Sequence, residues 1–540
     1  MEGDAHSMLG RRLEQHDSNQ LELKLAYDME PEERRQRYGV EAFIFLPRTL
    51  GVTTTSYPAS RFYEDTISFA RLRTPRVAVH ALATNGPGEK WFRIVEAPLE
   101  RMMAGERLDP VPVVNGLKLL AAIVRSSIRD ECLAFRERFR GMDLLSGGAR
   151  EARSAELATT LGRFLDDIRL LWARLRIVGE SAGHAAVDAQ IREVWTAIDE
   201  YTALNVEEVC TRIVELSDGA LKLPRTESLG TARRAFAEEA VQAYLYRRSR
   251  GFPSYVVPED ENESLPYRRH ILKRIVSSVL YLDIRQAESG VVMTNVVGMV
   301  AAGLAMLFAV LVTLWAQLRF DMFSTTFVFA AVVSYMLKDR IKEWGKQRLG
   351  RLFARWIPDK RLEVRDQTTG EVLGECRETV TIFDATRVDP SVRQLRHVDH
   401  QGKAATDGRP ETVIRYHKQV SLSSEALQKR LHGVDGLNDI IRFNLSHLRD
   451  RMDEPYELHT IVDPETRQLV TMRCARVYHV NLVLRFTRSR GDSVEVETER
   501  VRVILDQRGI KRVEPVSIGV RAPSLVRPTV QTAAVQPDYI

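Results

Sequence analysis

The sequence predicts an α+β membrane protein: a helical N-terminal bundle with a small β region, a two-helix transmembrane hairpin and a C-terminal antiparallel α+β domain. Three observations lead to this fold class. Residues 289–318 contain no charged side chain, apolar residues recur with helical spacing over residues 113–286, and apolar and polar residues alternate in several segments after residue 360. At 540 residues the chain has room for two or three domains.

Two uncharged segments in mid-chain predict the hairpin. We expect the first transmembrane helix at residues 287–318, a short periplasmic turn at 319–321 and the second transmembrane helix at 322–338. A helix needs about 20 apolar residues to cross a bilayer core, at about 1.5 Å per residue. The first segment exceeds this length, whereas the second has only 16 uncharged residues, so Lys338 has to extend toward the headgroups. The alternative is a buried hairpin in a soluble core, which a segment of 30 residues without charge on any face disfavours.

Basic residues on both sides of the hairpin predict its orientation. Residues 338–361 carry nine Lys and Arg against three acidic residues, and residues 267–288 carry five against two. The connecting loop holds one Arg and one Asp. Because basic flanks stay in the cytoplasm, both termini are expected there. Arginine far outnumbers lysine, which is typical of GC-rich bacterial genomes, so the predicted location is the bacterial inner (cytoplasmic) membrane, with two spans.

The residues before the hairpin divide into a disordered tail at 1–19, a small α+β region at 20–112 and a helical bundle at 113–286. In the α+β region, alternation predicts strands at 21–27 and 39–47, and a strand at 91–98 follows a Gly-Pro turn. Helical spacing of apolar residues predicts the members of the bundle. These are helices at 113–141, 154–179, 185–218 (as one helix or two) and 231–249, and a last helix at 265–289 that leads into the hairpin.

The residues after the hairpin begin with a basic amphipathic juxtamembrane helix at 339–358, which Pro358 ends. A cytoplasmic α+β domain follows at 359–520, and a disordered tail at 521–540. In the domain we expect a β-hairpin at 361–383, helices at 423–431 and 437–452, and an antiparallel meander over 456–516 with turns at Pro-Glu-Thr, Arg-Gly-Asp and Gln-Arg-Gly.

Two sets of residues are the candidate membrane site. The first set combines basic and aromatic side chains that suit anionic lipid headgroups: Lys338, Arg340, Lys342, Trp344, Arg348, Arg351, Arg355 and Trp356. The second set consists of small residues about four apart, which let helices approach closely: Gly298, Ala301, Ala302, Ala305, Ala309, Ala330 and Ser334. These small residues pack the two spans on each other, or one of their faces forms a homo-oligomer.

No pattern of residues predicts a catalytic site or a cofactor. The chain contains no phosphate-binding loop, dinucleotide fingerprint, nucleophile elbow or HExxH motif. A weak metal candidate is the group His397, Asp399 and His400, whose polar neighbours make an exposed loop the simpler interpretation. The four cysteines are far apart and predict reduced thiols, and the N-terminus has no apolar core for a cleavable signal peptide. Nucleic acid is disfavoured because the basic excess lies beside the membrane segment.

These observations predict an interaction or scaffold protein that holds a cytoplasmic protein partner, of unknown identity, at the membrane. The alternative is a membrane-anchored enzyme with a cytoplasmic site between domains. A pore made of several hairpins is a third possibility, and it has little support because the segments 289–318 and 322–337 contain no charged residue.

Overall fold

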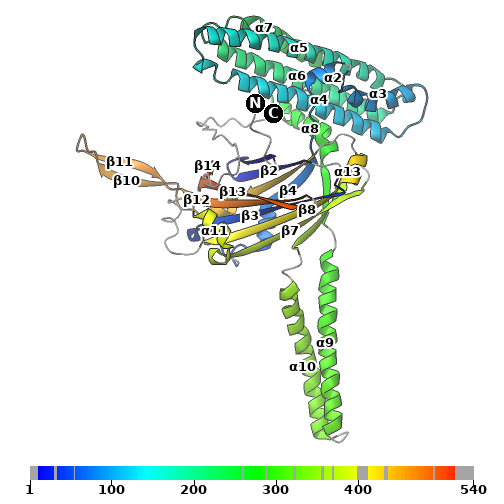
Figure 1. Cartoon of the computed structure of the whole chain (residues 1–540), viewed down its shortest axis with the longest axis vertical. Helices are drawn as coiled ribbons and strands as arrows, with labels where there is room; N and C mark the ends of the chain where they lie inside the picture. Colours follow the sequence, from blue (N-terminus) through cyan, green and yellow to red (C-terminus); the bar gives the residue numbers. More distant parts are fainter. Residues whose placement is uncertain are drawn as a thin grey trace. The chain divides into compact units, whose positions relative to one another are not determined.

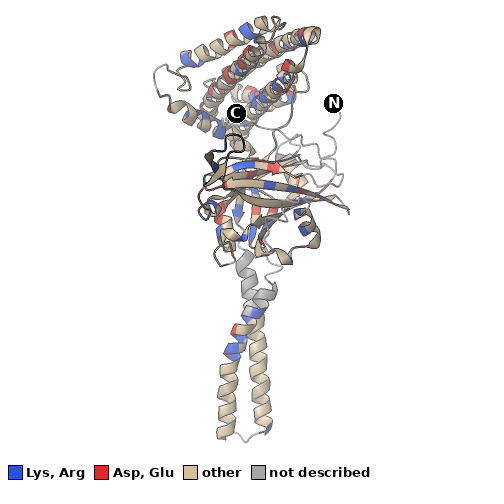
Figure 2. Ribbon diagram, turned by 90° about the vertical axis from the view of Figure 1, so that its left-hand side faces the viewer, with Lys and Arg blue, Asp and Glu red and all other residues tan. Residues whose placement is uncertain are grey.

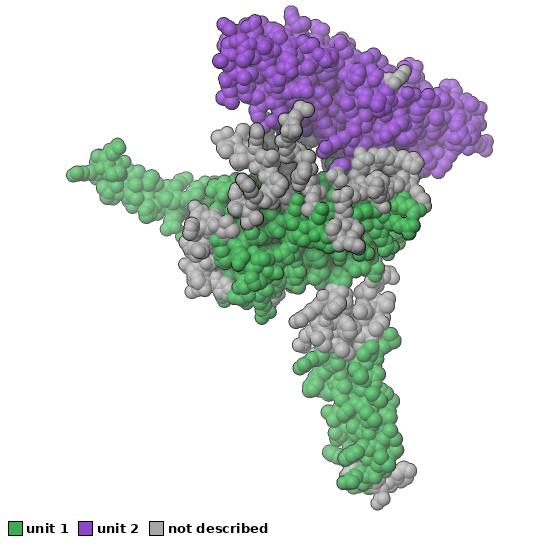
Figure 3. All heavy atoms as spheres, viewed as in Figure 1, with its two compact units in different colours: residues 1–71, 282–540 green, residues 72–281 purple. Residues whose placement is uncertain are grey.

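The computed structural model describes most of the chain between residues 10 and 516. The described ranges are 10–28, 33–53, 55–84, 86–257, 261–286, 289–319, 324–353, 358–367, 370–397, 411–430, 436–490 and 493–516. The tail predicted at 521–540 lies outside them. The disordered tail predicted at 1–19 is too long, because Gly10–Gln15 form a strand that pairs with the next one. The chain forms two compact units, residues 1–71 with 282–540 and residues 72–281 (Figure 3).

The unit at residues 72–281 is helical. Its helices are α2 (Val79–Ala83), α3 (Glu89–Met103), α4 (Pro110–Phe139), α5 (Gly147–Ala182), α6 (Ala189–Leu221), α7 (Leu229–Ser249) and α8 (Ser264–Ser277). The carboxylates of Asp109 and Asp188 accept hydrogen bonds from the first turns of α4 and α6, which fixes where these helices begin. The four helices predicted from 113 to 249 are confirmed, with residues 185–218 inside one continuous helix.

Two elements of this region differ from the prediction. Residues 91–98, expected as a strand, lie in α3, because Trp91, Val95, Leu99 and Met102 are buried on one side of a helix. The last helix of the bundle ends at Ser277 instead of leading into the hairpin, and the strand β5 (Leu282–Gln286) follows after a short 3₁₀ turn.

The other unit contains the sheets. Its strands are β1 (Gly10–Gln15), β2 (Gln20–Asp28), β3 (Arg35–Leu46), β4 (Thr66–Leu72), β5, β6 (Lys360–Asp366), β7 (Val372–Asp384), β8 (Thr412–Ser423), β9 (Gly436–Asn444), β10 (Tyr456–Val462), β11 (Leu469–Ala475), β12 (Tyr478–Arg490), β13 (Ser493–Asp506) and β14 (Gly509–Pro515). They form an eight-stranded sheet in the order β14-β13-β12-β3-β8-β7-β6-β5, a four-stranded sheet in the order β1-β2-β9-β4, and the two-stranded β10-β11 (Figure 1).

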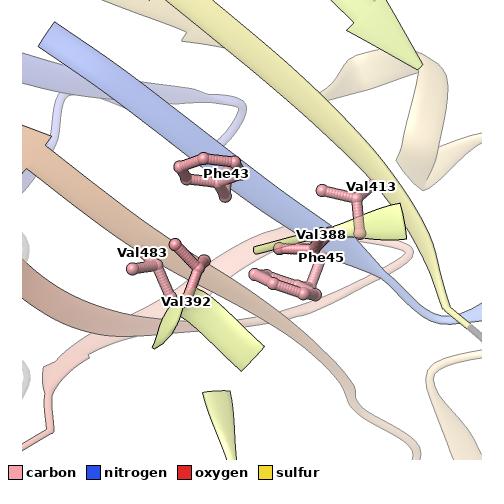
Figure 4. Close-up of a cluster of buried hydrophobic side chains, with 6 residues drawn as sticks. All are labelled: Phe43, Phe45, Val388, Val392, Val413 and Val483. Carbon is pink, nitrogen blue, oxygen red and sulfur yellow. The ribbon is translucent and has the colours of Figure 1, made fainter. Parts of the chain in front are cut away.

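The central strand β3 is buried on both faces over residues 40–46. On one face, Phe43 and Phe45 pack with Val388 and Val392 of the segment around α11 (Pro390–Arg396) (Figure 4). On the other face the eight-stranded sheet packs against the four-stranded sheet, where the ring of Tyr416 from β8 meets that of Phe443 from β9. The sheets therefore form a sandwich with a helix-covered outer face.

The strands join parts of the chain that the sequence analysis separated. Strand β3 pairs with β8 and β12, and β2 pairs with β9, so residues 20–46 belong to the same unit as residues 412–490. The division into a region at 20–112 and a domain at 359–520 therefore does not follow the units of the structure. The boundary falls differently because alternation shows that a strand exists without showing which distant strand it pairs with.

The C-terminal part confirms the β-hairpin of β6 and β7, the helix α13 (Ser424–Arg430) and the meander β12–β14. The helix expected at 437–452 is wrong. Residues 436–444 form β9, and only the short α14 (Ser446–Arg449) is helical. Strand β8, which lies between predicted elements, received no assignment from the sequence.

The two apolar segments form a helical hairpin, with α9 at Ser289–Arg319 and α10 at Thr325–Phe353. Helix α9 agrees with the predicted first helix. Helix α10 begins three residues after the predicted start and continues past Lys338 without interruption, so the predicted second span and most of the juxtamembrane helix are one helix.

Candidate functional site

The two helices of the hairpin contact each other through small residues. Ala301 and Ala305 of α9 and Ser334 of α10 are 1%, 1% and 2% exposed. A Cβ atom on Gly345 of α10 would lie 3.3 Å from the Cβ of Ala301. The Ser334 hydroxyl donates to the carbonyl oxygen of Ala309 at 3.5 Å. Small side chains thus let the backbones approach closely.

The remaining predicted packing residues, Gly298, Ala302, Ala309 and Ala330, are half-buried in the same hairpin. Of the two roles expected for the small residues, the structure shows the packing of the two helices on each other. Ala305 in particular is covered by α10 and is not free to meet a second hairpin.

The outer surface of the hairpin is covered with large exposed apolar side chains. On α9 these are Met299, Val300, Leu304, Met306, Leu307, Val310, Leu311, Leu314, Trp315 and Leu318, and on α10 Val328, Phe329, Val332, Tyr335, Met336 and Leu337. Two helices of the described chain are long and apolar enough to cross a membrane, one over residues 110–144 and one over Gly298–Arg319. The first is 67% buried and contributes to the core of the helical unit, whereas the second is only 17% buried.

The apolar stretches of the two helices differ in length. On α10 the uncharged residues 325–337 cover about 20 Å at the usual rise of a helix. On α9 the uncharged residues extend from 289 to 318, on both sides of Ala301. Ala301 faces Gly345, which lies in the charged part of α10. Charged residues of α10 therefore lie alongside an apolar part of α9 (Figure 2). The Lys338 ammonium lies 3.9 Å from the centre of the Tyr335 ring, one turn toward the tip of the hairpin.

The predicted lipid-contact residues lie on this part of α10. Arg340, Lys342, Trp344 and Arg348 are exposed and Lys338 is half-buried. The side chains of Arg351, Arg355 and Trp356 lie outside the described residues. The described lipid-contact residues are distributed around the helix instead of forming one stripe. Their side chains therefore contact the surroundings of this part of the hairpin.

A buried cluster of ionisable groups lies between the two sheets. The Lys418 ammonium of β8, 2% exposed, donates to Asp439 of β9 at 2.7 Å and to the Ser68 hydroxyl of β4 at 2.6 Å. Glu378 lies 4.0 Å from the same ammonium and accepts from the Tyr416 hydroxyl at 2.9 Å. One cation and two carboxylates thus share a buried site, where each charge depends on the others.

The chemistry of this cluster is that of a structural ion pair. Its carboxylates raise the pKa of Lys418 against the opposing effect of burial, so the ammonium stays protonated. Burial raises the pKa of the neighbouring Cys376 thiol to about 12, which keeps the thiol protonated at neutral pH. The adjoining cavity, lined by Tyr38, Cys376 and Lys418 among others, has a volume of about 10 Å³, enough for one water molecule. Neither nucleophile is activated and no substrate fits.

Sequence analysis missed this cluster, although a signal existed. Tyr416, Lys418, Val420 and Leu422 alternate with more exposed residues along β8 and are all buried. A lysine in the middle of an apolar alternation predicts a buried charge that needs a carboxylate partner.

A histidine outside the predicted candidates pairs with a carboxylate. His447 Nδ1 lies 3.2 Å from Asp65 Oδ1, and the Tyr57 hydroxyl donates to Asp65 Oδ2 at 2.7 Å. The Nε2 atom of His447 contacts the guanidinium of Arg61. Because a guanidinium only donates, Nε2 acts as an acceptor and has no free lone pair to serve as a general base.

The metal candidate is only partly described. His397 is the exposed residue that ends α11, and Asp399 and His400 lie outside the described residues. Within the described ranges, no group of three or more His, Cys, Asp or Glu side chains is placed to hold a metal ion. One hollow of about 510 Å³ is an open depression on the surface of the helical unit, where Arg140 and Arg153 already pair with Glu137 and Glu156.

Comparison of the chain with protein-family models, with curated proteins and with solved structures found no match.

Proposed function

We propose that the chain is a membrane-anchored interaction or scaffold protein, with α9 and α10 embedded in a lipid bilayer and the residues before and after this hairpin in the cytoplasm. The observation that carries the proposal is the outer surface of the hairpin. Large apolar side chains of both helices are exposed on this surface, while the small residues Ala301, Ala305 and Ser334 are buried between the helices. Such a surface is stable in a bilayer and unstable in water.

The charge pattern supports an orientation for this anchor. The basic excess on both flanks and the neutral tip favour a topology in which the tip at 319–324 crosses to the far side. The bacterial cytoplasmic membrane fits the arginine-rich composition, and anionic headgroups fit the exposed Arg340, Lys342 and Arg348. In this arrangement the residues before and after the hairpin are in the cytoplasm and meet a protein partner there.

An interaction role is favoured over the enzyme alternative by the state of the buried groups. The described groups best placed for acid–base or nucleophilic chemistry are Lys418, Cys376 and His447. The Lys418 ammonium donates to Asp439, burial raises the pKa of the Cys376 thiol, and His447 Nε2 contacts Arg61. They support the architecture of the sandwich instead of lining a cleft of substrate size.

Reporter fusions test the orientation. A reporter fused after Arg319, at the end of α9, is expected on the far side of the membrane, and one fused after Arg361 is expected on the cytoplasmic side, because the second helix returns the chain. A fusion after Tyr281, which precedes the hairpin, is the matched control and should report the cytoplasm. A cytoplasmic signal after Arg319, or a far-side signal after Arg361, would contradict a spanning hairpin with cytoplasmic flanks.

A further inference from the structure

Strands β10 and β11 form a two-stranded arm, residues 456–475, that extends away from the eight-stranded sheet (Figure 1). Nearly every side chain of both strands is exposed. The exposed set includes large apolar residues: Leu458 is 68%, Val462 61% and Leu469 76% exposed, with Val470 and Met472 also exposed. A two-stranded hairpin without a packed face has marginal stability in water, so this arm lacks a covering element.

The arm is nevertheless a well-formed structure. Its turn is fixed by Asp463, whose carboxylate accepts hydrogen bonds from the backbone N–H groups of Glu465 and Thr466 at 2.8 and 2.9 Å. Its base is fixed by Tyr456, whose hydroxyl accepts from the Arg508 guanidinium at 3.3 Å. The arm therefore presents its edges in a defined geometry.

The outer edge of β11 is poorly protected against pairing with another strand. The edges of the eight-stranded sheet carry charges: β14 has Lys511, Arg512 and Glu514, and β5 has Asp283 and Arg285. Charged side chains on an edge discourage pairing with another strand. Strand β11, with the sequence LVTMRCA, has only Arg473 and no proline.

The hydrogen bonds at the two ends of the arm show which backbone groups point outward. Arg476 N donates to Pro455 O at 3.0 Å, and Asp463 N donates to Gln468 O at 2.9 Å. In an antiparallel pair, hydrogen-bonded and non-hydrogen-bonded positions alternate. With the register of β10 and β11, residues 457, 459 and 461 are bonded to 474, 472 and 470. The N–H and C=O groups of Leu469, Thr471, Arg473 and Ala475 therefore point away from β10.

We propose that this edge of β11 pairs with the same edge of a second copy of the chain, antiparallel and centred on Met472. In this register Leu469 lies opposite Ala475, Val470 opposite Cys474 and Thr471 opposite Arg473 of the other copy, and Met472 lies opposite itself. The outward-pointing groups of both strands then face one another at every hydrogen-bonding position. The two arms form one continuous four-stranded sheet across a two-fold axis.

The charges and side-chain pairs favour the edge of β11 over that of β10, and they favour a second copy of the chain as the partner. In the proposed register the two arginines lie opposite threonines, so no like charges meet, and the six side chains of Val470, Met472 and Cys474 from both copies join into one apolar patch. The same operation on β10 places His459 opposite itself and buries Glu457 beside Ile461. A strongly charged peptide could form an ion pair only with Arg473 of β11. A second copy of β11 provides a suitable pairing residue at every position of the proposed register.

The inference goes beyond the proposed anchoring and does not depend on it, because the arm pairs equally well between copies in a bilayer or in detergent. It places a homo-oligomer contact on the arm, whereas the sequence analysis left open a homo-oligomer through the small residues of the membrane helices. Two copies held by their arms would present two sets of units to a partner.

Cysteine cross-linking of the full-length protein in mild detergent tests this contact. In a Cys474→Ser background, Met472→Cys brings the two introduced thiols to a non-hydrogen-bonded position, where Cα atoms lie about 4.5 Å apart and a disulfide fits. Thr460→Cys, on the outer edge of β10, is the matched control. We expect about tenfold more disulfide-linked dimer from Met472→Cys than from Thr460→Cys under mild oxidation. The other three cysteines are buried.

A second pair of variants separates pairing from chance collision. Thr471→Pro removes an outward N–H of β11 and leaves the backbone bonds between β10 and β11, so it should remove the dimer seen by mass photometry. It also removes the 3.0 Å hydrogen bond between the hydroxyls of Thr460 and Thr471, which Thr460→Pro removes equally. Thr460→Pro makes the same change on β10 and should leave the dimer intact. Equal cross-linking at 460 and 472, or a dimer that survives Thr471→Pro, would overturn the proposal. The proposal would also be overturned if the thiol at position 472 formed no cross-link and did not react with a polar maleimide. That result would show that another partner covers this edge of β11.

Discussion

Replacing Lys418 with methionine should loosen the sandwich far more than any surface substitution. The change leaves Asp439, 1% exposed, without its ammonium partner at 2.7 Å. Breaking a buried ion pair by removing one member costs about 3–5 kcal/mol, because the remaining charge stays out of water. Hydrogen exchange of peptides that cover β8 and β9, measured on the full-length protein in detergent, should accelerate by at least about a hundredfold.

Two controls accompany this measurement. Arg361→Met breaks the half-exposed pair with Glu375, 2.8 Å apart, and should change exchange by less than about tenfold because solvent screens it. The double substitution Lys418→Met with Asp439→Leu should recover part of the loss, with Glu378 left as the uncompensated charge. Exchange in Lys418→Met that matches Arg361→Met would show that the cluster is hydrated and contributes little.

The pH dependence of this contribution follows from the direction of the lysine pKa. The carboxylates raise the pKa of Lys418 above its ordinary value of 10.5, so the folded state binds the proton more tightly than the unfolded state. The stabilisation is therefore fully present below about pH 10.5 and is lost as the pH rises through the folded pKa. We expect the difference in exchange between wild type and Lys418→Met to be constant from about pH 6 to 9.

Excising the helical hairpin should convert the chain from a membrane-bound into a soluble protein. Strands β5 and β6 pair with each other, with Gln286 opposite Leu362, so the chain enters and leaves the hairpin at neighbouring positions of one sheet. A flexible linker of about six residues in place of residues 288–357 closes this gap as a long β-hairpin loop does. Asp359, which accepts from Val380 N at 2.6 Å, stays in place.

The excision should greatly weaken membrane association, because it removes all of the exposed apolar side chains of the hairpin together. Each large apolar side chain moved from water into apolar surroundings contributes about 1.5–3 kcal/mol, and more than a dozen are exposed on α9 and α10. The full chain should remain with membranes after alkaline extraction, and the excised chain should stay in the supernatant, with unchanged circular dichroism of its sheets. An excised chain that still resists extraction would place the anchor outside the hairpin.

Local periodicity predicted the helices and the hairpin because each displays its pattern within its own residues. Helix α9 has no charge over 30 residues, and α5 and α6 show the 3.6-residue period of a half-buried helix. The packing of α9 on α10 through Ala301 and Ala305 also follows from local spacing. The continuation of α10 past Lys338 follows from the absence of a helix breaker before Pro358.

The β9 error and the missed cluster have one common cause. Leu437, Asp439, Ile441 and Phe443 are buried on one face of β9, but the charge of Asp439 interrupts their alternation. The remaining apolar residues, Leu437, Ile440, Ile441 and Leu445, then have helical spacing, which predicted a helix. The carboxylate is tolerated there only because Lys418 meets it from another strand, a contact between distant residues that no local pattern contains.

The central claim is that lipid covers the outer surface of α9 and α10, and thiol accessibility in proteoliposomes tests it most directly. Leu311→Cys, in a Cys474→Ser background, places a thiol where the wild-type side chain is 57% exposed in the isolated chain. Thr460→Cys in the same background, at an exposed position on the outer edge of β10, supplies the control in vesicles of the same composition. A bilayer-embedded hairpin predicts that a polar maleimide added to both sides of the membrane labels the thiol at 460 readily and leaves the thiol at 311 unlabelled until the protein is unfolded in dodecyl sulfate. Labelling at position 311 as fast as at position 460 would contradict a lipid-covered hairpin.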